Sequence, residues 1–311
     1  MRVALFGGTG FIGSYLIDAL VSAEMRPIIL VRPGSEQRVR QPHACILRSG
    51  DVFDHEAVAR TVDGADAAIY NIGVLREFPA RGITFERLHF DAAKQVMDAA
   101  RAAGVRRFLL MSANGVKADG TAYQRTKYLA EQYLATTGLD WTVLRPSVLF
   151  GDPRGHQEFA TQLRRDIVDS PFPAPLFYPG LLPTAAGTFR MSPVHVADVA
   201  QAFVAVLRRP ETIGQVLTLG GPGALSWRQI IATIAAATGK RKWMLPVPAS
   251  AVALAAVALE RSPAFPITRD QIRMLLEGNT CSPDALRALE IEPQPFDVAG
   301  LAYLTAAPNG I

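Results

Sequence analysis

The sequence has few cysteines, few aromatic residues and no block of like charge. Its 311 residues include two cysteines and five histidines, while aromatic residues make up 8% and charged residues 19% of the chain. Because Cys45 and Cys281 lie far apart in the sequence, a small disulfide-stapled scaffold is excluded. The histidines show none of the spacings that metal ligands adopt, so we expect no metal site. Low-complexity segments and internal repeats are also absent, and the composition excludes a disordered chain.

The charge balance is mildly basic and is not concentrated in one segment. Lys and Arg number 32 against 28 Asp and Glu, a formal net charge of +4. An anionic cofactor or an anionic membrane face would account for this excess, and we expect no nucleic-acid partner. Met1 runs directly into an apolar segment without the basic and apolar regions of a leader. We therefore expect a cytoplasmic location, with peripheral attachment to the inner membrane face as the alternative.

Apolar residues are plentiful. They make up 49% of the chain, and the mean hydropathy is +0.16. A chain of this length accommodates two domains, or one doubly wound domain with an appended lobe, and it can bury a large core. The composition therefore favours a globular protein.

The chain opens with a pattern of strand, glycine turn and helix. Val3–Phe6 is apolar, a glycine cluster follows, and apolar residues then recur at helical spacing. The first amides of a helix lack partners and carry a positive partial charge, so they bind a pyrophosphate when no Cβ keeps it at a distance. Glycines three residues apart remove those Cβ atoms, which predicts a dinucleotide-binding turn. The expected cofactor-binding residues of this turn are Gly7, Thr9, Gly10, Phe11, Ile12 and Gly13.

A second strand is predicted over Pro27–Gly34, and the residue near its end bears on the choice of cofactor. In dinucleotide-binding folds an acidic residue at this place holds the adenosine ribose hydroxyls, whereas an arginine pairs with a 2′-phosphate. This chain carries Arg32 there, and the first acid is Glu36. We therefore expect NADP(H) in preference to NAD(H). The alternative is that Arg32 only stacks on the adenine ring.

The next two predicted strands end in small or polar residues. Residues 45–52 end in a Gly-Asp-Val sequence, where Asp51, with Val52 beside it, would accept from the adenine amino group or would cap a turn. Residues 65–73 run into Asn71 and Gly73, where the small side chains allow a close approach to cofactor ribose. We expect these four residues to contact the cofactor.

The candidate chemistry lies further along the chain. A helix over residues 86–103 ends at Gly104, and a strand over residues 106–112 ends in Ser112. In the helix that follows, Tyr123 and Lys127 are four residues apart and share a face. A neighbouring ammonium lowers the pKa of a phenol, so Tyr123 could exchange a proton with an alcohol or a carbonyl while Ser112 holds the same oxygen. The alternative is an ordinary surface tyrosine and lysine.

The remainder is less regular. After a strand over residues 141–146, residues 152–190 carry six prolines and suit irregular substrate-facing loops. Asp198 is predicted to cap a helix over residues 199–207, and a strand over residues 215–219 follows. Ser226 opens a capping box. Ala249–Leu259 is an uncharged helix too short to span a bilayer.

Two features of this part bear on partners. A helix that is apolar all round is usually buried, yet the flanking Lys240–Trp243 and Arg261 would suit a membrane interface, so both readings stay open for Ala249–Leu259. Apolar residues of this part favour a hydrophobic or quinone-like ligand over a nucleotide sugar. They are Phe172, Phe177, Tyr178, Leu181 and Leu182.

Taken together, these motifs resemble the extended and atypical short-chain dehydrogenase/reductase superfamily over nearly the whole chain. The residues that carry the resemblance are Gly7, Gly10, Gly13, Gly50–Asp51, Asn71–Gly73, Ser112, Tyr123, Lys127, Leu144–Ser147 and Pro193–Ala200. A second set is similar to the bacterial relatives of the thirty-nine-kilodalton accessory subunit of respiratory complex I. That set comprises Thr84–His89, Gly104–Phe108, residues 147–151 and Leu219–Pro222.

The resemblance implies a tightly held NADPH, with Pro146 and Val148 lining the nicotinamide side. For the complex I branch it also implies a place beside the membrane arm, near the quinone site, and some members of that branch are structural and lack the Tyr-Lys pair. This chain keeps the pair, but it has His89 where the extended enzymes often have an asparagine.

We therefore expect an α/β protein with a Rossmann-type doubly wound parallel sheet and a smaller discontinuous C-terminal lobe. The dinucleotide-binding domain is predicted over residues 1–151, completed by residues 191–220, and the substrate or partner lobe over residues 152–190 and 221–311. The expected function is an NADP(H)-dependent oxidoreductase with Ser112, Tyr123 and Lys127 as catalytic residues, Lys127 also holding cofactor. The alternatives are a nucleotide-holding subunit or assembly factor of a respiratory membrane complex and, less favoured, a redox-sensing regulator.

Overall fold

A computed structural model describes residues 1–180, 182–251 and 269–305. The chain divides into two compact units. The first comprises Met1–Pro146, Val196–Leu219 and Ala285–Glu292, and the other described residues form the second. In the sequence the first unit is therefore interrupted by segments of the second.

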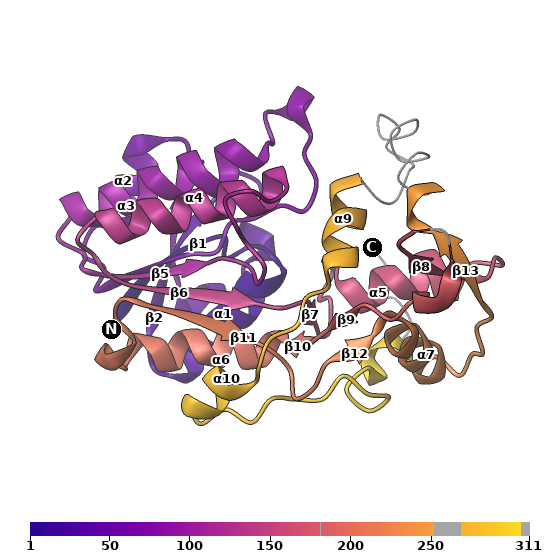
Figure 1. The fold of residues 1–311 in the computed structure, drawn as a ribbon. Coiled ribbons are helices and arrows are strands. Elements are labelled where there is room, and N and C mark those ends of the chain that lie inside the picture. Colours follow the sequence, from indigo (N-terminus) through magenta and orange to yellow (C-terminus); the bar gives the residue numbers. More distant parts are fainter. Residues whose placement is uncertain (181, 252–268, 306–311) are drawn as a thin grey trace. The chain divides into compact units, whose positions relative to one another are not determined.

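The first unit is built on a seven-stranded sheet, seen in Figure 1. Its spatial order is β11-β6-β5-β4-β1-β2-β3, and every neighbouring pair is parallel. The strand order reverses between β1 and β4, and ligands of open α/β sheets bind at the carboxyl ends of the strands beside such a point. The strands are β1 (Arg2–Phe6), β2 (Arg26–Val31), β3 (Ile46–Ser49), β4 (Ala67–Tyr70), β5 (Arg107–Met111), β6 (Asp140–Pro146) and β11 (Gln215–Leu219).

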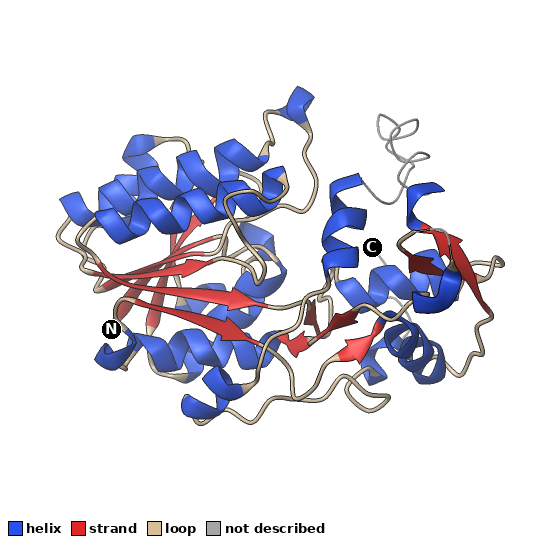
Figure 2. Ribbon diagram, in the orientation of Figure 1, coloured by secondary structure: helices blue, strands red, loops and turns tan. Residues whose placement is uncertain are grey.

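Helices cover both faces of this sheet, as Figure 2 shows. One face carries α2 (His55–Val62), α3 (Ala92–Ala102) and α4 (Ala122–Thr136). The other carries α1 (Phe11–Ser22) and α6 (Val196–Leu207), which pack against each other. The short α10 (Asp284–Ala288) follows near the end of the chain. A parallel sheet covered on both faces explains why its strands are apolar without alternation. The predicted Rossmann-type α/β fold is confirmed.

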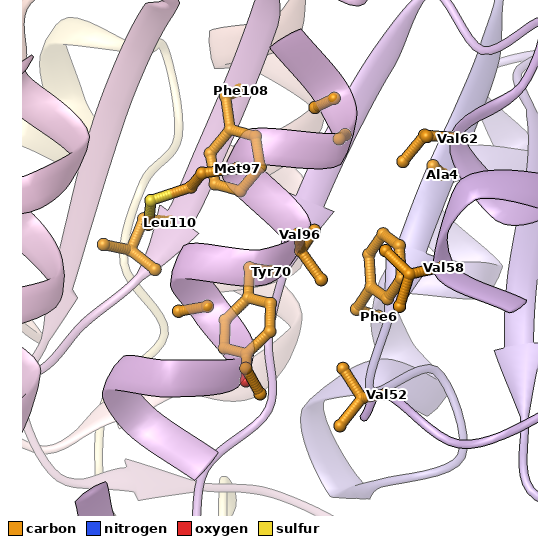
Figure 3. Packing of buried hydrophobic residues seen from close by; sticks show 14 of the residues in the cluster. Ala4, Phe6, Val52, Val58, Val62, Tyr70, Val96, Met97, Phe108 and Leu110 are labelled. Atoms are coloured by element: carbon orange, nitrogen blue, oxygen red, sulfur yellow. The ribbon is translucent and has the colours of Figure 1, made fainter. Parts of the chain in front are cut away.

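The core of the first unit lies between the sheet and these helices. Figure 3 shows the side with α2 and α3, where Phe6, Tyr70 and Phe108 from three strands meet Val96 and Met97 of α3. All five are at most 1% exposed, and burying a side chain of this size stabilises a fold by about 1.5–3 kcal/mol. This packing holds the parallel strands beside one another, with their carboxyl ends along one edge of the sheet.

Several predicted boundaries differ from the structure. Asp198 does not cap a helix, because α6 already begins at Val196 and places Asp198, which is 2% exposed, within its first turn. The helix predicted over residues 86–103 is a π-helical turn, Glu86–Asp91, followed by α3. The capping box at Ser226 is confirmed, since its hydroxyl accepts from the amide of Gln229 and the Gln229 side chain accepts from the Ser226 amide.

The second unit contains short paired strands and helices around its own core. Its helices are α5 (Phe159–Leu163), α7 (Trp227–Ala237) and α9 (Arg269–Glu277). The strand pairs are β7 (Leu149–Phe150) with β10 (Val194–His195), β9 (Arg190–Met191) with β12 (Leu225–Ser226), and β8 (Ala174–Tyr178) with β13 (Met244–Pro248). Trp227, Ile230 and Ile231 of α7 are buried at its centre.

One prediction for this unit needs correction, and another concerns residues that the structure does not describe. Residues 152–190 are not only irregular loops, because they contain α5, a π-helical turn over Arg164–Val168 and strand β8. The sequence pattern missed these elements because each is only five residues long. Leu181 and most of the predicted helix Ala249–Leu259 fall outside the described residues.

Candidate functional site

The turn between β1 and α1 folds so tightly that it excludes side chains. Gly7 has φ +94°, and a Cβ there would lie 2.9 Å from the carbonyl carbon and oxygen of Asn71. A Cβ on Gly13 would lie 2.2 Å from the carbonyl oxygen of Gly7. Since real Cβ atoms do not approach backbone atoms so closely, both positions require glycine. The first turn of α1 is thus packed directly against the end of β1.

The outer side of the same turn is open. Gly10 is the N-cap of α1, no side chain caps the helix, and no acidic residue lies in its first turn. A Cβ on Gly10 would meet only the carbonyl oxygen of Gly7, at the ordinary contact distance of 3.5 Å. The positive end of the helix dipole therefore faces space that a phosphate could occupy. Thr9, Phe11 and Ile12 are partly exposed around it.

Two buried oxygen atoms at the neighbouring strand ends have no hydrogen-bond partner. They are Oδ1 of Asn71, directly after β4, and Oγ of Ser112, directly after β5. Their backbone amides are satisfied, because Asn71 donates to Phe6 O at 2.9 Å and Ser112 donates to Leu144 O at 2.8 Å. A buried polar atom left unpaired costs about 1–3 kcal/mol. Such atoms at the ligand-binding edge of the sheet mark places where a bound molecule would complete the hydrogen bonding.

Lys127 lies beside these atoms. Its Nζ donates to the carbonyl of Met111, the residue before Ser112, at 3.0 Å. A Cβ on Gly73 would lie 3.3 Å from the same Nζ, so the loop after β4 passes close to it. Burial lowers the pKa of Lys127 to about 8, while the negative charge of Glu131 acts in the opposite direction. Glu131 itself is paired with Arg145 of β6.

Two aromatic rings pack against the half-buried side chain of Tyr123. Its ring lies edge-on to Phe85, with centroids 5.7 Å apart, and edge-on to His89 at 5.2 Å. Burial raises the pKa of Tyr123 to about 12. The pKa of Tyr123 is therefore raised by burial, whereas the sequence predicted a lowered pKa. The Lys127 ammonium is directed at the Met111 carbonyl, and the aromatic surroundings disfavour the phenolate.

His89, which the sequence marked only as a departure from the asparagine of the extended enzymes, has a positioning role in this site. Its Nε2 accepts from the amide of Val74 at 3.1 Å, so its proton is on Nδ1, which lies 3.2 Å from the hydroxyl of Thr126. Thr126 in turn donates to Ala122 O. Burial, together with the charge of Lys127, lowers the pKa of His89 to about 2. Neutral His89 thereby ties the loop after β4 to α4. Phe85 and His89 are four residues apart, and this helical spacing is the feature of the sequence that indicates that their rings share a face.

The remaining predicted cofactor residues occupy several environments. Arg32 is exposed just after β2. Asp51 is exposed, and its Oδ1 accepts from the amide of Phe53 at 3.0 Å, which is the turn-capping alternative. The side chain of Val52 packs in the core shown in Figure 3, so only its backbone is available to a ligand. Pro146 ends β6, and its carbonyl accepts from Asn114 N at 2.9 Å. Val148 belongs to the second unit, where its carbonyl accepts from Val194 N.

The apolar residues proposed to face substrate are not all available. Phe177 and Tyr178 are 6% and 8% exposed in the core of the second unit, so they stabilise that unit and do not meet a ligand. Phe172 and Leu182 are exposed. Within residues 1–180, 182–251 and 269–305, no cluster of His, Cys, Asp and Glu could hold a metal ion. None of the helices described for the chain has the length and apolar character needed to cross a membrane.

The enclosure of Tyr123 has a measurable consequence. In the ligand-free protein we expect Tyr123 to titrate near pH 12, above the value of about 10 for a free tyrosine. The difference between the ultraviolet tyrosinate titrations of the wild type and of Tyr123→Phe isolates this group. A difference curve with its midpoint at or below 10 would contradict the described environment. Lys127→Met is a control that should leave the midpoint raised, because burial is its cause.

Comparison with known proteins agrees with this geometry. A family model described as NAD(P)H-binding matches residues 7–169, more than half of the chain. The mitochondrial NADH dehydrogenase (ubiquinone) 1 alpha subcomplex subunit 9 of Arabidopsis thaliana is 26% identical over 332 residues, covering 98% of this chain and 78% of that protein. Ceramide reductase of Caulobacter vibrioides is 28% identical over 208 residues, covering 67% of this chain and 61% of the reductase.

A solved structure has the same fold. UDP-glucose 4-epimerase of Thermus thermophilus, in complex with NAD, superposes with a TM-score of 0.71 at 19% identity, and 98% of each chain is covered. The similarity to the complex I subunit is thus confirmed, and so is the fold that the resemblance to the short-chain dehydrogenase/reductase superfamily implied. The chain belongs to the NAD(P)H-binding family.

Proposed function

We propose that this protein is an NADP(H)-dependent oxidoreductase that acts on a hydrophobic or quinone-like carbonyl compound. The observation that carries the proposal is the pair of unpartnered buried oxygens, Asn71 Oδ1 and Ser112 Oγ, at the strand ends beside Lys127. Membership of an NAD(P)H-binding family accounts for the open glycine turn. A bound nucleotide or substrate would supply the hydrogen bonds that these two oxygens lack.

The cofactor-binding roles follow from the chemistry of each position. The glycine turn and the start of α1 would hold the pyrophosphate. Asn71, Gly73 and Lys127 would meet the nicotinamide ribose, and Arg32 would pair with a 2′-phosphate on the adenosine ribose. The adenine ring would lie against the backbone at Asp51 and Val52. The nicotinamide side would be lined by Pro146 and Val148.

The catalytic roles depend on protonation. A bound nicotinamide supplies or accepts a hydride at C4. With a pKa of about 12, Tyr123 is a neutral acid at physiological pH and can give its proton to a carbonyl oxygen as that oxygen gains negative charge. Ser112 would donate a hydrogen bond to the same oxygen. The ammonium of Lys127 would stabilise the phenolate that remains, which lowers the barrier to the transfer.

The relatives support reduction of an apolar compound. One match is named a ceramide reductase. The aromatic side chains of Phe85 and His89 around Tyr123 make the vicinity of the acid suitable for an apolar group.

The glycine turn can be tested with a substitution that spares the fold. In Gly10→Ala the added methyl meets only an ordinary contact within the protein, but it lies at the uncapped end of α1, where we propose that the phosphate binds. We expect NADPH affinity, measured by calorimetry, to fall by about 5- to 150-fold, the range of a steric penalty of about 1–3 kcal/mol. Gly223→Ala, where a methyl meets nothing within 4 Å, is the matched control and should bind NADPH like the wild type. Equal affinities of both variants would refute the assignment.

The cofactor preference depends on Arg32. We expect Arg32→Ala to weaken NADPH binding by about tenfold while leaving NADH binding within about twofold, because only NADPH offers a 2′-phosphate for a charge-assisted hydrogen bond. Arg26→Ala is the control, since Arg26 is exposed at the opposite end of the same strand. If Arg32→Ala weakened both nucleotides equally, Arg32 would be acting by stacking on adenine.

Catalysis can be tested with NADPH and a water-soluble ubiquinone analogue as the probe. We expect Tyr123→Phe to lower kcat by about 100-fold or more, because the proton donor is lost. NADPH affinity should stay within about twofold. Tyr128→Phe, five residues along the same helix, should keep the wild-type rate. Equal NADPH oxidation by wild type and Tyr123→Phe would exclude the proposed acid, and a wild type that does not oxidise NADPH with this probe would exclude the quinone class.

A second function is supported by the relatives named as complex I subunits. One of them matches 98% of this chain. In this alternative the nucleotide is structural, and the protein is an accessory subunit or assembly factor of a respiratory complex at the membrane. Co-purification of the tagged full chain with respiratory subunits, undisturbed by Tyr123→Phe, would favour it. If Tyr123→Phe still binds NADPH but cells that carry it behave like cells without the protein, the enzyme is favoured.

A further inference from the structure

The second unit carries two unusually exposed aromatic side chains. Trp243 is 83% exposed and Phe172 is 74% exposed, the two highest values among the large apolar residues of the described chain. Exposing a single apolar residue is common, but two large aromatic residues together indicate a surface that meets another body. We call these two residues, with Lys240, Arg241 and Lys242, the basic-aromatic patch.

The backbone brings the two aromatic residues together. Strands β8 and β13 are parallel and start side by side, with Ala174 paired to Met244, and both are labelled in Figure 1. The amide of Ala174 donates to the carbonyl of Trp243 at 2.7 Å, so the ladder extends to the tryptophan. Phe172 lies two residues before Ala174. The two aromatic side chains therefore flank the same end of a strand pair.

The basic residues of the patch are fixed to the segment that leads to Phe172. Lys240 Nζ binds Asp169 Oδ1 at 2.6 Å, and Lys242 Nζ donates to the carbonyls of Val168 and Ser170. Carbonyls do not neutralise an ammonium, so Lys242 keeps its charge. Arg241 is exposed and has no ion pair among the described residues. The patch thus presents cations at defined positions beside the aromatic rings.

The local charge is strongly unbalanced. Residues 164–172 and 240–243 contain the basic residues Arg164, Arg165, Lys240, Arg241 and Lys242 and the acidic residues Asp166 and Asp169. Five positive charges against two negative charges leave a net charge of +3. Arg164, Arg165 and Lys240 form ion pairs with the two acids, so Arg241 and Lys242 are the cations of this set that lack an acidic partner among the described residues.

Beside the patch the surface is hollowed. An open depression of about 460 Å³ is bordered by residues 240–244 and floored by Ala232, Ala235 and Ala236 of α7. The lining combines cations, small apolar side chains and an exposed tryptophan. A bilayer surface offers matching groups, because its anionic phosphates lie above the first acyl carbons.

We propose that the basic-aromatic patch docks the chain onto an anionic phospholipid bilayer. Trp243 and Phe172 enter the headgroup region, and Arg241 and Lys242 pair with lipid phosphates. A tryptophan with an apolar body and a polar N–H suits that layer. A nucleic acid is disfavoured because the sequence that continues from β13, Ala249–Leu259, has no charged residue. The proposal concerns the second unit alone and does not depend on whether the first unit is catalytic.

The test uses the full chain and two kinds of vesicle. We expect the wild type to sediment with vesicles of phosphatidylcholine and phosphatidylglycerol but not with vesicles of phosphatidylcholine alone. The partition coefficient should fall about fivefold in Arg241→Gln, the share of one basic residue near an anionic surface. It should fall by about tenfold or more in Trp243→Ala, because a large aromatic anchor is lost. The emission of Trp243 should shift to the blue on anionic vesicles, a shift that Trp243→Phe abolishes.

Matched controls keep the result specific. Arg26→Gln and Val216→Ala change an exposed basic and an exposed apolar residue in the first unit and should sediment like the wild type. Every variant should bind NADPH with unchanged affinity, which excludes misfolding, and Tyr123→Phe should still bind vesicles. The proposal is overturned if neutral and anionic vesicles bind equally, if Arg241→Gln and Trp243→Ala bind like the wild type, or if a single-stranded oligonucleotide displaces the vesicles.

Discussion

The close contact between the start of α1 and the end of β1 is the constraint on which the site depends. Gly13 can lie against the carbonyl of Gly7 only because neither residue has a Cβ. This contact aims the uncapped end of α1 at the carboxyl edge of the sheet, where its amides and dipole favour an anion. The contact between Gly7 and Asn71 then sets the distance from the turn to β4. A single backbone arrangement thus positions the uncapped end of α1 and the first of the two unpartnered oxygens.

The chemistry of the site depends on burial more than on pairs of opposite charges. Burial raises the pKa of Tyr123 to about 12 and lowers the pKa of His89 to about 2, so both side chains are neutral near pH 7. It lowers the pKa of Lys127 only to about 8, so Lys127 remains mostly an ammonium. His89 contributes by position. It holds the loop after β4 through Val74 and contacts the ring of Tyr123.

The two units carry different kinds of surface. In the first, the features that suggest a ligand are buried oxygens and missing side chains at a sheet edge. In the second, they are exposed aromatic residues and unneutralised cations. The first kind suits a small molecule that replaces water completely, and the second suits an extended surface that remains wet. An oxidoreductase with an apolar substrate and an accessory subunit at a membrane would both use this division.

Local patterns in the sequence determined the parallel sheet, the glycine turn, the Ser226 capping box and the shared helix of Tyr123 and Lys127. These depend on residues a few positions apart, and strand and helix periodicity expresses such spacing directly. Only the tertiary structure decided the partners of these residues. Distant segments are joined by the contact of Tyr123 with His89, by the hydrogen bond from Lys127 to Met111, and by the burial of Phe177 and Tyr178 in a core. The pairing of β8 with β13 likewise brings the segments of Phe172 and Trp243 to the same end of a strand pair. Burial and pairing depend on which elements pack together, and the spacing of residues along one segment carries no information about that packing.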